Sequence, residues 1–94
     1  MGDNVRLDAK VTGFVQGVGY RYYILRKVAG RNIVGYVRNL PGGRQVRVVA
    51  EGPSDQLEDL LQDIREGPEG SFVEQVDVGW SVASGEFSRF EVRY

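Results

Sequence analysis

Apolar and polar residues alternate along the first part of the chain. Between residues 5 and 12, Leu7, Ala9 and Val11 fall on one side and polar or charged residues on the other. A period of two is that of a β-strand with one buried face. Four further stretches have a strand-like pattern: 33–40, 45–51, 72–80 and 87–94. The sequence therefore predicts five strands.

Two other stretches have helical spacing. Between residues 20 and 31, Ile24 and Val28 lie four apart, and so do Leu25 and Ala29. Residues at this spacing line one side of a helix. The second stretch has apolar residues at i, i+3, i+4 and i+7: Leu57, Leu60, Leu61 and Ile64. These two patterns predict two helices with one buried face each.

Local signals set the expected ends of these elements. We expect Ser54 or Asp55 to cap the second helix, and Asp55 and Glu58 have the spacing of a capping box. Gly67 and Pro68 should end it. The turn 41–43, Pro-Gly-Gly, separates two strand-like stretches and predicts a hairpin.

The expected order is strand, helix, strand, strand, helix, strand, with one closing strand. A β-α-β-β-α-β order packs two helices on one face of a mainly antiparallel sheet. The predicted fold class is therefore α+β. The length of 94 residues suits one modest core, so we expect residues 1–94 to form a single domain.

Composition narrows the chemistry. The chain has no cysteine and no histidine, which removes disulfides, thiolate chemistry and the commonest metal ligand and general base. Its net charge of −1 offers no broad basic surface for nucleic acid or an anionic membrane. No stretch approaches the roughly 20 apolar residues of a membrane span. We expect a cytoplasmic protein that holds no metal and binds neither nucleic acid nor membrane.

The stretch Gly13–Arg21 carries the clearest chemical signal. It contains three glycines and joins a predicted strand to a predicted helix. A glycine-rich turn that opens a helix leaves backbone N–H groups free to bind an anion. Arg21 adds a planar fork of donors that matches phosphate or carboxylate. These features predict an oxyanion site, with phosphate as the favoured ligand.

The chain contains two distinctive motifs: Val11-x-Gly13-x-Val15-Gln16-Gly17-Val18-x-Tyr20-Arg21 and Gly35-Tyr36-Val37-Arg38-Asn39, the second followed by a glycine turn and residues 46–52. These motifs resemble the two signatures of the acylphosphatases. The similarity runs from about Leu7 to Tyr94. It implies a ferredoxin-like two-layer α/β sandwich, in agreement with the expected element order. It also implies hydrolysis of the carboxyl–phosphate bond of acyl phosphates, to a carboxylate and inorganic phosphate, without a metal or cofactor.

The resemblance also implies roles for individual residues. Arg21 matches the phosphate-binding arginine of the family, and Asn39 matches its water-positioning asparagine. The backbone amides that hold the phosphate fall on Val15, Gln16, Gly17, Val18, Gly19 and Tyr20. The chain departs from the family at Tyr20, where phenylalanine or methionine is usual, so the hydroxyl needs a partner. The hairpin after Asn39 also looks one residue longer.

Two alternative functions compete with that of a monomeric acylphosphatase that acts on a small molecule. A non-catalytic ferredoxin-like domain could bind a small anion or a partner protein, since one fold supports many functions. The joint presence of Arg21 and Asn39 disfavours it. An RNA-binding module would need aromatic residues on the middle strands, and the stretch 45–51 has none. A domain that begins a larger carbamoyl-phosphate-handling protein is a related setting; we favour the free-standing enzyme.

Overall fold

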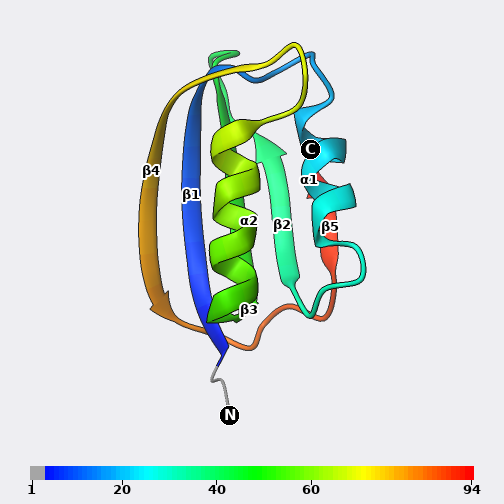
Figure 1. Cartoon of the computed structure of the whole chain (residues 1–94), viewed down its shortest axis with the longest axis vertical. Helices are drawn as coiled ribbons and strands as arrows, with labels where there is room; N and C mark the ends of the chain where they lie inside the picture. The colour runs from blue at the N-terminus through cyan, green and yellow to red at the C-terminus, as the bar shows by residue number, and fades with distance from the viewer. Residues whose placement is uncertain (1–3) are drawn as a thin grey trace.

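The computed structural model describes residues 4–94, which form one five-stranded sheet and two helices. In chain order the elements are β1 (Asn4–Phe14), α1 (Tyr20–Val28), β2 (Val34–Asn39), β3 (Gln45–Pro53), α2 (Ser54–Glu66), β4 (Phe72–Val82) and β5 (Phe90–Arg93). Both helices cover the same face of the sheet (Figure 1). The expected α+β order and the two-layer ferredoxin-like sandwich are confirmed.

The sheet has the strand order β4-β1-β3-β2-β5. β1 stands between β4 and β3 and runs antiparallel to both. β2 is antiparallel to β3, as the predicted hairpin requires, and parallel to β5. Because β1 and β2 run in opposite directions to β3, the end of β1 lies at the same end of the sheet as the end of β2.

The core lies between the sheet and the helices. The alternation that predicted β1 is confirmed, because Leu7, Ala9 and Val11 are fully buried. From the helix side Leu57, Leu60 and Ile64 of α2 fill the same layer, while Leu61 packs at its rim. No helix in residues 4–94 has the length and apolar character needed to cross a membrane.

Helix ends differ from the sequence-based expectation in two places. α2 begins at Ser54 with Pro53 as its N-cap residue, and no side chain caps it, so the predicted capping box is wrong. Proline offers no side-chain acceptor, and the chain turns into the helix through its fixed backbone angle instead. α1 stops at Val28 rather than near Arg31, because Ala29 already has extended backbone angles.

A buried carboxylate fixes the connection between β4 and β5. Glu51 of β3 is 2% exposed. Its carboxylate accepts hydrogen bonds from Ser84 N (3.0 Å), Ser84 Oγ (2.8 Å) and Gly85 N (3.0 Å). Arg6 Nη1 lies 3.4 Å from Glu51 Oε2. Burial alone would raise the pKa of Glu51, but these donors and the Arg6 charge outweigh it and lower the pKa. The contact holds the segment that leads into β5.

We predict that Glu51→Gln destabilises the protein by about 1–3 kcal/mol near neutral pH, since the amide loses the charged acceptor. A lowered folded-state pKa stabilises the fold at pH values above the unfolded pKa, about 4.3, and this stability is lost as the pH falls through the folded-state value. Urea unfolding of wild type and Glu51→Gln, from neutral pH down through the acid range, measures the free energy of unfolding of each protein.

The stability difference between wild type and Glu51→Gln should therefore be largest near neutral pH and should shrink in acid. Glu86→Gln is a matched control, because the Glu86 side chain is 61% exposed and lies 3.8 Å from the same arginine. A difference that stays constant down through the acid range would contradict the assigned role of the Glu51 charge.

Candidate functional site

The glycine-rich loop 15–19 joins β1 to α1 and is anchored in the core. Val15 is fully buried and Val18 packs against the core from the side. Between and after them, Gly17 and Gly19 have φ angles of +76° and +77°. A Cβ at either position would meet open space, so the left-handed backbone itself requires glycine here. Anchored valines and permissive glycines together hold the loop in one shape.

The side chain of Gln16 fastens this loop to the β2–β3 hairpin. Its amide nitrogen donates to the carbonyl oxygens of Leu40 and Gln45, each at 2.8 Å. Leu40 N in turn donates to Gln45 O at 2.9 Å. Leu40 directly follows Asn39, so the loop is tied to the end of β2. This role could not be predicted from the residue pattern, because the Gln16 side chain pairs with backbone atoms that are distant along the chain.

The start of α1 presents unpaired backbone donors. Gly19 is its N-cap residue, and the first bond of the helix runs from Tyr23 N to Gly19 O at 2.9 Å. The N–H groups of the first turn therefore have no acceptor within the helix. The first turn contains no acidic residue, so no carboxylate of its own offsets the positive end of the helix dipole. Such an end favours a bound anion.

Tyr20 fixes this helix start against the second helix. Its ring is 2% exposed, and its hydroxyl donates to Ile64 O at 2.7 Å. This carbonyl is the partner that the buried hydroxyl needs. Burial, with a smaller contribution from Tyr23, raises the pKa of Tyr20 far above its ordinary value, so the hydroxyl stays a proton donor. The presence of a tyrosine at position 20 thus adds a hydrogen bond between α1 and α2.

Arg21 lies in the first turn of α1 with its guanidinium over an aromatic ring. Its Cζ is 4.6 Å from the centroid of the Tyr94 ring. The Tyr94 hydroxyl lies 2.6 Å from that of Tyr22, a contact that raises the pKa of Tyr94. Within residues 4–94 the Arg21 guanidinium makes no hydrogen bond or ion pair. A cation–π contact thus orients the guanidinium and leaves its N–H donors available.

Tyr94 was missed at the sequence level. The alternation of residues 87–94 assigned it only to a strand, and the structure ends β5 at Arg93. Because β5 is parallel to β2, its end reaches the same end of the sheet as Asn39. This topology, which cannot be read from the residue pattern, brings Tyr94 to Arg21. Tyr22 lies exposed, and its hydroxyl is hydrogen-bonded to that of Tyr94.

Asn39 is the last residue of β2, paired with Val46 of β3. Alternation along β2 places it on the same face as Val37, which is fully buried beneath the helices. No hydrogen bond from its side-chain amide is found in the described part of the chain, residues 4–94. Asn39 therefore lies on the helix face of the sheet with its donor and acceptor groups uncommitted.

The predicted site residues gather at one end of the molecule. The loop, the start of α1 and the end of β2 all lie at the upper end in Figure 1. The bonds of Gln16 confirm that the loop and the strand end are neighbours. Across residues 4–94 no group of three or more carboxylates is close enough to hold a metal ion. The loop, the start of α1 and the end of β2 thus bring together backbone amides, the guanidinium of Arg21 and the side-chain amide of Asn39.

This arrangement can bind an anion and present a polar neutral group beside it. Backbone N–H groups and a guanidinium match the oxygens of a phosphate. A separate groove, lined by Val5, Glu58 and Trp80 among others, lies at the start of β1 and so at the opposite end of that strand. It shares no residue with the group described here.

Comparison with known proteins agrees with the motifs. The family model described as Acylphosphatase matches residues 7–92. An acylphosphatase of Salinibacter ruber is 46% identical over 92 residues, covering 98% of this chain and 96% of that protein. One of Thermus thermophilus is 48% identical over 80 residues, covering 85% and 90%.

Solved structures give the same result. The crystal structure of acylphosphatase from Bacillus subtilis superposes with a TM-score of 0.89 at 31% identity, covering 96% of this chain and 99% of that one. The similarity thus extends over nearly the whole chain in sequence and in structure. The chain belongs to the acylphosphatase family.

Proposed function

We propose that this chain hydrolyses the carboxyl–phosphate bond of acyl phosphates and releases a carboxylate and inorganic phosphate. One observation carries the proposal: three groups that have no hydrogen-bond partners of their own among residues 4–94 lie together at one end of the sheet. They are the Arg21 guanidinium, the free backbone amides of the loop and the α1 start, and the side chain of Asn39. Membership of the acylphosphatase family supports the same reaction.

The phosphate is proposed to bind to the backbone amides of residues 15–20, while the Arg21 guanidinium donates hydrogen bonds to its oxygens. A guanidinium can bind two phosphate oxygens at once. The contact of Arg21 with the Tyr94 ring is a cation–π contact and uses no hydrogen-bond acceptor, so the N–H groups of Arg21 remain free for the substrate. Phosphoryl transfer depends chiefly on positioning and on stabilising charge, which are what these groups supply.

Asn39 is proposed to position the attacking water. Its side-chain oxygen can accept a hydrogen bond from the water and aim it at phosphorus, in line with the bond to the carboxylate. As the new phosphorus–oxygen bond forms, the bond to the carboxylate breaks and its electron pair leaves with the carboxylate. An amide is no base, so one proton of the water is proposed to pass to a phosphate oxygen, while the other stays on the attacking oxygen. Both protons then leave on inorganic phosphate.

The setting of the reaction is also proposed. Residues 1–94 are proposed to act as one domain and as a monomer on a small-molecule substrate, without nucleic acid. The absence of cysteine suits a reducing compartment such as the cytoplasm. The family resemblance implies that no metal or cofactor takes part.

We predict that Arg21→Ala lowers kcat/KM for acetyl or benzoyl phosphate by about 100-fold or more, because a preorganised charge on the phosphate is lost. The assay is run in EDTA, where wild type should remain active. Arg26→Ala is the matched control, since Arg26 is an exposed arginine of the same helix. Circular dichroism checks that both variants fold.

Two results would count against the proposal. One is an Arg21→Ala enzyme that works at nearly the rate of Arg26→Ala. The other is a wild-type protein that is inactive in EDTA and recovers only with added metal.

For Asn39→Ala we expect kcat to fall by about 100-fold, since a misplaced water costs that much, while inhibition by inorganic phosphate changes little. An interaction made only in the transition state lowers kcat without weakening ground-state binding. Asn32→Ala, a change at an exposed asparagine outside the site, is the control. Equal losses of kcat and of phosphate binding would make Asn39 a phosphate contact instead.

A further inference from the structure

β4 leaves one edge of the sheet open. It is eleven residues long and stands at the end of the strand order, paired only with β1 among residues 4–94. An edge strand presents a row of backbone N–H and C=O groups to solvent, and an extended peptide can add to it as a further strand. Figure 1 shows β4 at the outer left of the sheet, with no helix over its outer side.

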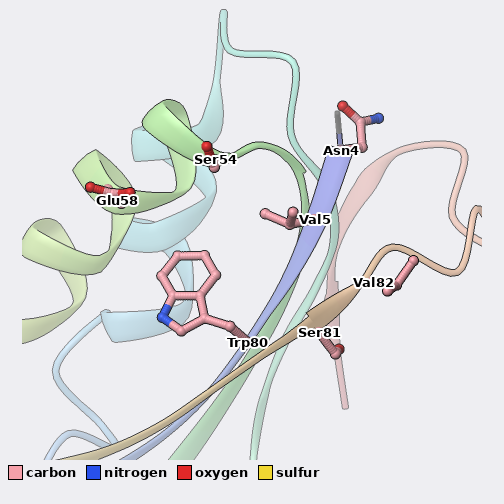
Figure 2. Close-up of a pocket in the computed structure, with 7 residues that line it drawn as sticks. All are labelled: Asn4, Val5, Ser54, Glu58, Trp80, Ser81 and Val82. Carbon is pink, nitrogen blue, oxygen red and sulfur yellow. The ribbon is translucent and has the colours of Figure 1, made fainter. Parts of the chain in front are cut away.

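A groove lies beside this edge, between β4 and the beginning of α2. Its volume is about 690 Å³, and it is lined by Asn4, Val5, Ser54, Glu58, Trp80, Ser81 and Val82. The Trp80 side chain is 45% exposed. Figure 2 shows its indole rising from β4 toward the first turns of α2, where Ser54 and Glu58 lie. An aromatic face beside a carboxylate suits a positively charged side chain.

The chain segment that contains α2 and β4 is strongly acidic. Residues 51–77 hold nine of the thirteen acidic residues and only one of the twelve basic ones, a net charge of −8. Asp55, Glu58 and Asp59 lie exposed on α2, and Glu74 and Asp77 lie exposed on β4. In the part of the chain that the structure describes, Glu58 takes part in no ion pair.

We propose that the β4 edge and the Trp80 groove form a docking site for an extended polypeptide segment rich in lysine or arginine. The segment adds to β4 as a sixth strand, and one cationic side chain enters the groove between Trp80 and Glu58. Charge complementarity favours this occupant over a second copy of the chain. Two β4 edges paired about a two-fold axis would bring the same acidic surfaces together, which is repulsive.

The docking site lies away from the proposed catalytic site. Asn4 and Val5 of the groove begin β1, whereas the glycine-rich loop follows its end at Phe14. A strand of this length spans roughly 30 Å at about 3.3 Å per residue. A docked segment therefore leaves Arg21 accessible. The two proposals can fail independently, because peptide binding is measured without substrate and hydrolysis without peptide.

The test uses Trp80 as its reporter, since it is the only tryptophan of the chain. The full chain is titrated with a short end-blocked peptide in which lysine and valine alternate, and the amides are followed by NMR. We expect a saturable change in Trp80 emission and amide shifts confined to β4 and the start of α2. Affinity should fall as salt rises. A matched peptide with glutamate in place of lysine should not bind.

Two controls separate the groove from general attraction. Glu58→Gln should weaken binding of the lysine peptide by about two- to five-fold relative to Asp59→Asn. Both changes remove one negative charge from exposed positions of α2, but only Glu58 lines the groove. N-methylation of alternate peptide amides should abolish binding if the peptide adds as a strand, because it removes the ladder donors.

Four results would overturn the proposal. They are equal binding of the glutamate peptide, amide shifts away from β4, equal affinities of Glu58→Gln and Asp59→Asn, and undiminished binding of the N-methylated peptide. Sedimentation supplies a further check. Self-association through β4 in the absence of peptide would assign the surface to a second copy of this chain.

Discussion

Two hydrogen bonds of one side chain connect the parts of the site. The Gln16 amide nitrogen donates to Leu40 O and Gln45 O, and so fixes the glycine-rich loop to the hairpin that follows Asn39. The loop alone is a set of backbone donors, and the strand end alone is an amide at the edge of a sheet. Held together, they can act on the same substrate. Preorganised groups of this kind need no rearrangement during the reaction.

The positive charge of Arg21 is held in place without a carboxylate partner. Arg21 is oriented by the ring of Tyr94, and that ring is held through the hydroxyl of Tyr22. A carboxylate partner would have fixed Arg21 equally well, but it would have occupied the donors and repelled a phosphate. Nine of the thirteen acidic residues instead lie in 51–77, most of them on α2 and β4. This distribution of charge supports an anionic substrate at the proposed site and a basic partner at the proposed docking site.

The sequence predicted the architecture because each element has a regular period. The alternation of Leu7, Ala9 and Val11 and the helical spacing of residues 57–64 appear unchanged in the structure. The roles of Gln16 and Tyr94 could not be predicted, since both depend on contacts between segments brought together only by the strand order. The capping box of α2 failed because the preceding proline, not a side-chain acceptor, sets the start of the helix.

Binding of inorganic phosphate tests the central claim most directly, because it isolates the proposed phosphate site from the chemical step. Phosphate is titrated into ¹⁵N-labelled protein, for wild type and for Gln16→Ala. The account predicts saturable amide shifts in residues 15–21, and weaker binding in Gln16→Ala although Arg21 is intact. Shifts that map elsewhere, or equal affinities for the two proteins, would contradict it.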